Sequence, residues 1–426
     1  MSAFALTLLF AFALCASLGV KFWLASRQIR HVARHRDQVP PAFAGTVTPQ
    51  AHQKAADYTV AKGRLGLLST AWGALVLLGW TLLGGLDWLN GGLSDAMAPS
   101  WGPMAYQLAL LASFVLINSV LEAPFDLYST FRIEQRFGFN RLTWRLLLVD
   151  TLKGVLVGAV LGLPLAALVL WLMAAAGSLW WLWAWAAWTG FNVLMMVLYP
   201  TVIAPLFNRF EPLQDESVRS RVQALMERCG FASKGLFVMD GSKRSAHGNA
   251  YFTGFGAAKR VVFFDTLLSK LNPPEVEAVL AHELGHFKHR HVLKRMLTLF
   301  ALSLGGFALL GWVSAQPWFY LGLGVQPSMS APNDALALLL FMLAVPVFGY
   351  FLAPLSARVS RRHEFEADAY ARAQTSGQDL GSALLKLHED NAATLTPDPL
   401  YVRFYYSHPP AGERLAALGV GPAQPA

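Results

Sequence analysis

The sequence predicts a mainly α-helical, polytopic membrane protein that carries a small α+β region outside the bilayer. Three observations indicate this class: 55% of the residues are hydrophobic, 14% are charged, and the mean hydropathy is +0.41. Soluble globular domains average about 45–50% apolar and about 25% charged residues. The 426-residue chain is therefore more apolar than a soluble fold would be.

Apolar runs of the length of a membrane helix occur seven times. A helix needs about 20 apolar residues to cross a hydrocarbon core of about 30 Å. In the first run the basic residues follow the apolar stretch, which favours a retained membrane helix over a cleaved signal peptide. The sequence thus predicts seven transmembrane helices, at residues 3–24, 66–86, 104–122, 153–176, 179–204, 296–315 and 335–355.

The distribution of Lys and Arg predicts the orientation of these helices. The segments 87–103, 177–178 and 316–334 contain neither residue, whereas the alternate segments are basic. Because cytoplasmic loops carry an excess of Lys and Arg, we expect the N-terminus outside and the C-terminus in the cytoplasm. The same bias accounts for the net charge of +8, so a nucleic-acid partner is not needed to explain the charge. The partner that we expect around the helices is membrane lipid.

The predicted helices divide the chain into four parts. Residues 1–205 form a five-helix membrane region with cytoplasmic loops, and residues 206–295 form a cytoplasmic insert. Residues 296–355 hold helices six and seven, and residues 356–426 form a cytoplasmic C-terminal region.

The insert combines helical and strand patterns. Residues 212–231 are amphipathic, and "GLFVMD" (235–240) is typical of a short strand. Residues 249–255 and 260–268 flank the turn "GAAK", which predicts a β-hairpin. Two prolines then precede "EVEAVLAHELGHFKHRH", and proline is tolerated in the first turn of a helix.

That last helix carries a His-Glu-x-x-His pattern. His282 and His286 are four residues apart, so both project from one face and can bind one metal ion. Glu283 follows the first histidine and can reach the attacking water. A basic helix with incidental histidines is the alternative, and it explains His289 and His291 better than it explains the first two.

A third metal ligand is available near the C-terminus. Because the chain has only two cysteines, one in an apolar and one in a polar segment, a metal must be held by His, Asp or Glu. In "SRRHEFEADAYARA" (360–373), Glu364 and Asp368 share one helix face. Two histidines and a later Glu form the zinc site of one class of peptidases, and an acidic residue four positions on suits a contact to a ligand histidine. Glu366 is an alternative ligand. On a helix it would point away from Glu364, so only one of the two can face the metal, and for Glu366 a solvated position is the better interpretation.

These motifs resemble one known family, the type I CAAX prenyl endopeptidases, which are integral-membrane zinc metalloproteases. The similarity covers most of the chain. It rests on "PFDLYSTFRIEQRFGFN" (124–140), "PLFNRFEPL" (205–213), "GNAYFTGF" (248–255), "AHELGHFKHRH" (281–291), "RRHEFEAD" (361–368) and "DPLYVRFYYSHPPAGERL" (398–415). HtpX-type stress proteases share the zinc helix but usually have fewer membrane spans.

The resemblance implies a role for each matching residue. Zn²⁺ is expected on His282, His286 and Glu364, with Glu283 as general base and Asp368 behind a ligand histidine. His408 is expected near the developing oxyanion. Residues on an edge strand and one arginine are expected to contact the substrate: Asn249, Ala250, Tyr251 and Arg414. The family fold is seven helices around a chamber.

Three functions remain open at this point. The first is removal of the last three residues from a prenylated CAAX protein, and the second is broader proteolysis of peptides or membrane proteins with the same site. The third is a non-proteolytic channel or receptor, which the complete set of metal-site residues disfavours. We expect a bacterial inner membrane location, or the endoplasmic reticulum in a eukaryote.

Overall fold

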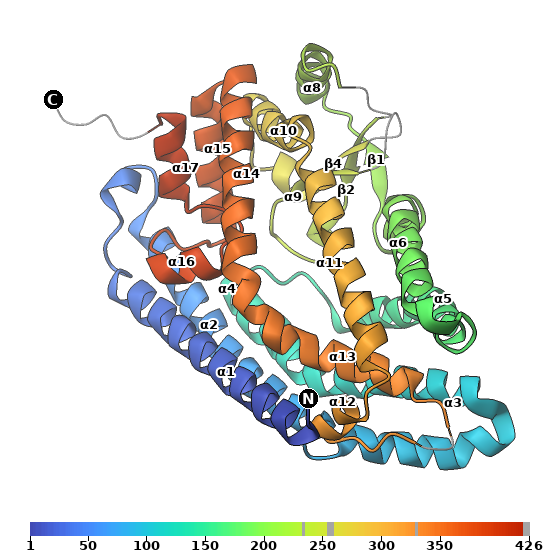
Figure 1. Cartoon of the computed structure of the whole chain (residues 1–426). Coiled ribbons are helices and arrows are strands. Elements are labelled where there is room, and N and C mark those ends of the chain that lie inside the picture. Colours follow the sequence, from blue (N-terminus) through green and yellow to red (C-terminus); the bar gives the residue numbers. More distant parts are fainter. Residues whose placement is uncertain (232–234, 254–259, 329–330, 421–426) are drawn as a thin grey trace.

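The computed structural model describes residues 1–231, 235–253, 260–328 and 331–420. Helices make up most of the chain, and a small sheet lies on one side of the molecule, near α6 and α10 (Figure 1). The longest helices outside the insert are α1 (Ala3–Arg34), α2 (Pro49–Trp80), α3 (Gly85–Tyr128), α5 (Trp144–Ala175), α6 (Trp180–Leu198), α11 (His291–Val313), α13 (Asp334–Gly349) and α14 (Ala353–Gln374). Short helices follow α3, α6 and α11: α4 (Gln135–Phe137), α7 (Ala204–Phe207) and α12 (Pro317–Gly322).

Three of the long helices begin at a residue whose side chain caps the first turn. Ser2, Thr48 and Thr143 each accept a hydrogen bond from a backbone N–H three residues on. A hydroxyl at this position satisfies a donor that the helix itself cannot pair. These caps fix where the helices begin. The first half of α2 is polar, so this helix begins well before its apolar run.

Among the described residues, six helical stretches are long and apolar enough to cross a membrane, so the protein is an integral membrane protein. They are Ala3–Arg34, Gly85–Phe137, Trp144–Ala175, Gly177–Phe207, His291–Val313 and Asp334–Gln374. The expected count of seven is not confirmed. The predicted span 66–86 is interrupted because α2 ends at Trp80 and Gly84 turns the chain with φ +77°.

The third predicted span is part of a longer, bent helix. α3 covers 44 residues, and Gly102 breaks its regular path with φ +82° just before Pro103. Glycine adopts this left-handed conformation without a steric penalty, and proline cannot donate to the preceding turn. The predicted segment 104–122 follows this bend.

The insert contains a four-stranded sheet in the order β1-β2-β4-β3. β2 and β4 pair in parallel, and β1 and β3 pair antiparallel to them on either side. The strands and the helices around them are β1 (Phe210–Pro212), α8 (Glu216–Arg228), β2 (Leu236–Met239), β3 (Ala250–Thr253), β4 (Arg260–Phe264), α9 (Asp265–Leu268) and α10 (Pro273–Lys288).

The predicted β-hairpin is confirmed as β3 and β4. Its turn, "GAAK", lies outside the described residues. The second strand ends at Phe264, because residues 265–268 form the helical turn α9 where the sequence predicted a continuing strand. β1 was not predicted from the sequence.

The C-terminal region contributes four helices, which are α14, α15 (Gly377–Asp390), α16 (Pro399–Tyr405) and α17 (Ala411–Leu418). Of these, α14 and α15 pack against α10. Val276, Leu280 and Leu284 of α10 are buried in the core that this region shares with the sheet and α8. α14 continues upward from α13 and runs alongside α10, so it links the membrane helices to the insert (Figure 1).

Candidate metal centre and active site

The histidines of the metal-ligand motif lie on α10, whose start is fixed by several local contacts. Asn272 accepts a hydrogen bond from the Glu275 N–H, and the Glu275 carboxylate accepts one from the Asn272 N–H. Pro273 and Pro274 occupy the first two helical positions. This capping box fixes the register of the helix, and thereby the direction in which the histidines two turns later point.

Close packing of α14 on α10 is possible because residue 285 is glycine. A Cβ atom on Gly285 would lie 2.9 Å from the Ala367 Cα atom and 3.0 Å from its carbonyl oxygen. Real Cβ atoms almost never approach backbone so closely, and the two helices would have to separate. The glycine between the two histidines therefore lets Glu364 reach them.

His282, His286 and Glu364 meet at one point. The His282 and His286 Nε2 atoms are 3.3 Å apart, and each lies 3.4 Å from an oxygen of Glu364. Tetrahedral zinc with bonds of about 2.0–2.1 Å requires ligand atoms about 3.3–3.4 Å apart. Glu364 Oε2 is also buried and has no hydrogen-bond partner among the described residues, an arrangement that a cation would complete. The three side chains therefore fit a metal ion.

A buried ion pair contacts the Nδ1 side of the His282 ring, away from Nε2. Asp368 Oδ1 lies 2.8 Å from His282 Nδ1, and Arg414 Nε donates to Asp368 Oδ2 at 2.8 Å. Asp368 and Arg414 are only 1% and 6% exposed, so their charges are compensated by each other. Arg414, expected to bind substrate, has its Nη1 atom 3.8 Å from Glu364 Oε2 and also lines the cavity beside the three side chains.

His286 has a supporting chain of its own. Its Nδ1 lies 2.9 Å from His291 Nδ1, and His291 Nε2 lies 2.9 Å from a Glu366 oxygen. Arg362 in turn donates to Glu366 at 2.9 Å. Glu366 is thus engaged by His291 and Arg362, and it is not free in solvent as the sequence suggested.

His291, His363 and Glu366 are themselves close enough to hold a metal ion. The hydrogen-bond pattern argues against that use. If His286 binds a metal through Nε2, its Nδ1–H donates to His291 Nδ1, and the proton of neutral His291 must then sit on Nε2. That N–H donates to Glu366. The His363 ring moreover stacks on His291, with 3.9 Å between the centroids and 12° between the planes, so the lone pairs of the two rings lie in nearly parallel planes.

Glu283 and His408 line the same small cavity as His282 and Glu364. This cavity has a volume of 130 Å³, and burial raises the pKa of the Glu283 carboxyl. His408 Nε2 lies 3.4 Å from Glu364 Oε1. Its side chain is exposed to the cavity, yet desolvation by the surrounding protein lowers its pKa. Because its pKa is lowered, His408 is expected to be neutral at pH 7.

The edge-strand residues differ in their position. Asn249 and Ala250 line the same small cavity, and the Asn249 side chain accepts a hydrogen bond from the Ala250 N–H. Beyond β3, no further strand covers this edge within the described ranges. Tyr251 instead packs edge-on against Phe264, 6.2 Å between ring centroids, and lines neither this cavity nor the larger one beside it.

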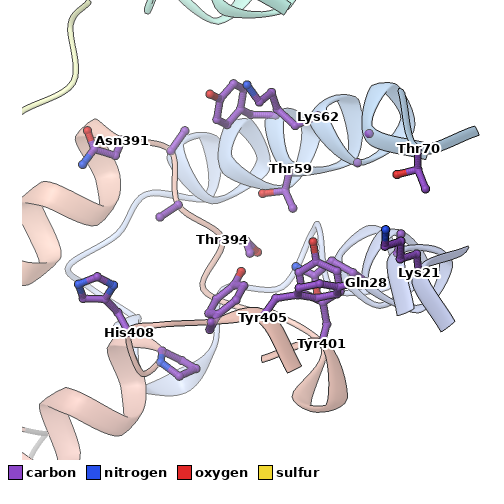
Figure 2. Close-up of a pocket in the computed structure, with 18 of the residues that line it drawn as sticks. Lys21, Gln28, Thr59, Lys62, Thr70, Asn391, Thr394, Tyr401, Tyr405 and His408 are labelled. Atoms are coloured by element: carbon purple, nitrogen blue, oxygen red, sulfur yellow. The ribbon is translucent and has the colours of Figure 1, made fainter. Parts of the chain in front are cut away.

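The small cavity adjoins a larger one of 1080 Å³. Asn249, His408 and Arg414 line both. The larger cavity reaches between α1, α2 and α13, where its walls include Lys21, Gln28, Thr59 and Thr70 (Figure 2). Tyr401 and Tyr405 of α16 lie between these membrane helices and His408 in this view (Figure 2). The ligand group thus stands at one end of a space that extends among membrane helices.

Two family models match the chain and together cover most of it. Residues 28–209 match the model described as "CAAX prenyl protease N-terminal, five membrane helices". Residues 212–420 match the model of "Peptidase family M48". The boundary between them falls at the start of the insert that carries the sheet and α10.

Individual relatives are similar over almost their whole length. The "CAAX prenyl protease 1 homolog" of Arabidopsis thaliana is 34% identical over 389 residues, 89% of this chain and 90% of that protein. "CAAX prenyl protease 1" of Saccharomyces cerevisiae is 30% identical over 424 residues, 95% of this chain and 93% of that protein. The crystal structure of S. mikatae Ste24p superposes with a TM-score of 0.90 at 28% identity, covering 97% of this chain and 99% of that one. The chain belongs to peptidase family M48, among the membrane metallopeptidases of the CAAX prenyl protease type.

Proposed function

We propose that the chain is a zinc endopeptidase that removes the C-terminal tripeptide from prenylated proteins ending in a CAAX sequence. The observation that carries this proposal is the continuity between the ligand group and a cavity of 1080 Å³ among membrane helices. An isoprenoid-modified cysteine can lie against apolar helices there while the neighbouring peptide bond reaches the ligands. Relatives that are named CAAX prenyl proteases support the same substrate class.

The residues at the ligand group divide the chemistry among them. His282, His286 and Glu364 would hold Zn²⁺, which when bound supplies Lewis-acid activation of the scissile carbonyl and of water. Glu283 takes a proton from the attacking water and delivers it to the leaving amine, a task that its raised pKa suits. Neutral His408 can donate from Nε2 to the oxyanion, a contact typically worth about 2.7–4 kcal/mol.

The substrate backbone would extend the sheet at β3. Ala250 and Asn249 present this edge next to the ligand group. A peptide that adds to a sheet edge forms backbone hydrogen bonds, which place the scissile bond without strong demands on side chains. Binding of this kind favours a substrate that is recognised by its prenyl group and its free C-terminus.

The same feature favours a second candidate function. Recognition of backbone by an open strand edge would also admit unprenylated peptides, so a broader membrane protease uses the identical site. The difference between the two candidates lies in how much of the binding comes from the apolar cavity.

A paired cleavage assay separates the two candidates. The full chain in detergent is incubated with two quenched peptides of one sequence, one farnesylated with a CAAX end and one unprenylated. Glu283→Gln is the inactive variant, and Glu389→Gln, an exposed carboxylate on α15, is the matched control. Cleavage of the farnesylated peptide alone supports the CAAX proposal, and equal cleavage of both supports the broader protease. If zinc-loaded protein cleaves neither peptide, both candidate functions are wrong.

A further inference from the structure

A second large cavity lies apart from the metal centre, against α2, α3 and the π-helical turn η2 (Ser129–Glu134). Its volume is 760 Å³, and it shares no lining residue with the two cavities at the active site. Three arginines line it: Arg64 from α2, Arg132 from η2 and Arg136 from α4. The remaining walls are apolar and are formed by Ala61, Leu65, Leu68, Pro124, Phe125, Tyr128, Ile133 and Phe137.

Among the described residues, carboxylates compensate the positive charge of this cavity only in part, through an electrostatic interaction between Arg136 and Asp57. Within the described part of the chain, no carboxylate pairs with Arg64 or Arg132, and Arg136 lies over the Phe137 ring at 5.5 Å. Two acidic groups of this region already accept hydrogen bonds from other cations, Asp57 from Arg36 and Glu134 from Lys62. Three guanidinium groups around one space therefore favour an anion inside it.

The cavity also lies at the edge of the apolar zone of two helices. Arg64 directly precedes the apolar second half of α2, and Arg132 follows the apolar part of α3. Leu68 and Tyr128 are 65% and 53% exposed, although both are large and largely apolar. The cavity therefore has arginine side chains at one end and an exposed apolar wall at the other. An amphiphile with an anionic head group can contact both ends.

We propose that this cavity binds one anionic phospholipid from the surrounding membrane. The phosphate would lie among Arg64, Arg132 and Arg136, and an acyl chain would cover Leu68 and Tyr128. Arginine is suited to this contact because its planar fork donates two hydrogen bonds to one phosphate. A free phosphate would use the same arginines but leave the apolar wall exposed, so a lipid is the occupant that satisfies both ends.

A bound lipid here would contact a helix that also shapes the active-site cavity. Thr59, Gly63 and Gly66 of α2 line the 1080 Å³ cavity, whereas Arg64 and Leu68 of the same helix line this one. The bound lipid would contact the face of α2 opposite the face that lines the active-site cavity. The proposal depends on these contacts and not on the proposed substrate.

Native mass spectrometry of the full chain tests the site. Phosphatidylglycerol and phosphatidylcholine with the same acyl chains are titrated into the detergent-solubilised protein, and inorganic phosphate is added in a separate arm. The double variant Arg132→Gln/Arg136→Gln is compared with Arg141→Gln/Arg145→Gln, which removes two exposed arginines at the same spacing outside the cavity. Arg64→Gln is a second variant, on another helix. Circular dichroism verifies that each variant is folded.

The parent is expected to retain phosphatidylglycerol more strongly than phosphatidylcholine, and the control pair is expected to behave like the parent. Because each basic side chain near anionic lipid contributes about 1 kcal/mol, the cavity double variant should bind phosphatidylglycerol roughly tenfold or more weakly, and Arg64→Gln roughly fivefold more weakly. Displacement of the lipid by millimolar phosphate would overturn the lipid assignment. Equal losses in both double variants, or no preference in the parent, would overturn the site itself.

Discussion

Gly285 illustrates how a single residue controls the metal centre. It separates Glu283 from His286 in the sequence, and in space it allows the backbone of α14 to lie against α10. The sequence pattern places the two histidines on one helix face, but it does not show that the intervening position must lack a side chain. That requirement arises from a contact between helices that are more than 60 residues apart in the chain, counted from Lys288 to Ala353.

Gly285→Ala is therefore expected to weaken metal binding while the protein stays folded. The added Cβ would overpack the α10–α14 contact at a cost of about 1–3 kcal/mol, which corresponds to roughly 5- to 150-fold in metal affinity. Gly305→Ala on α11, where a Cβ meets nothing within 4 Å, is the control. Competition with a chelator measures both affinities, and equal affinities in the two variants would contradict the packing argument.

His291 is a residue whose role the sequence did not indicate. The histidine lies at the start of α11, and Arg290 before it has φ +56°, a left-handed conformation that is uncommon outside glycine. This turn brings the His291 ring back to His286. Sequence periodicity assumes regular helices, so it cannot predict a contact made by a reversal of this kind.

Loss of His291 is expected to weaken metal binding because His286 would lose the acceptor that orients its ring. Removing such an outer partner typically costs 10- to 100-fold in metal affinity. His291→Ala should show this loss, and Glu366→Gln should show a smaller one, since a glutamine oxygen can still accept the His291 N–H. His289→Ala is the control, because His289 stacks on His291 without contacting His286. Zinc affinity by chelator competition is the measurement, and an unchanged value in His291→Ala would refute the role.

At the scale of elements, the helices and the hairpin were the predictable part of the fold. Hydrophobic runs predicted where most long helices would lie, and the alternation around "GAAK" predicted β3 and β4. The exception is α2, because apolar residues continue past Trp80 into a glycine turn that ends the helix. Hydropathy records polarity, whereas the helix end depends on backbone conformation.

The start of α10 makes a testable contribution to stability through Glu275. Burial alone would raise the pKa of this carboxyl, but hydrogen bonds from Lys386, Ser382 and the Asn272 N–H outweigh it and lower the pKa. A group with a depressed pKa in the folded state stabilises the fold above its unfolded pKa. This contribution is lost as the pH falls through the lower, folded pKa.

Glu275→Gln is expected to destabilise the protein by about 1–3 kcal/mol at pH 7. The difference from the parent should shrink below pH 4.5, the ordinary pKa of the group, as the parent carboxylate becomes protonated. Thermal unfolding in detergent at both pH values measures this, with exposed Glu389→Gln as the control. A difference that stays constant as the pH falls would show that the charge of Glu275 is not the cause.

At the scale of the whole molecule, the membrane orientation is a prediction of its own. The basic segments alternate with three that lack Lys and Arg, which predicts that the C-terminus and the metal centre lie in the cytoplasm. A green fluorescent protein fused after Ala426 should fluoresce, whereas an alkaline phosphatase fused there should be inactive. The reverse pattern would require the active site to face outward and would contradict the proposed orientation.

The central claim is that one metal ion, held by His282, His286 and Glu364, makes this membrane chain a peptidase. Metal content by inductively coupled plasma mass spectrometry tests it most directly, on the purified parent and on Glu283→Gln, Glu364→Ala and His363→Ala. We expect one zinc per chain in the parent, in Glu283→Gln and in His363→Ala, and almost none in Glu364→Ala. Zinc that persists in Glu364→Ala, or is lost in His363→Ala, would show that the metal lies elsewhere.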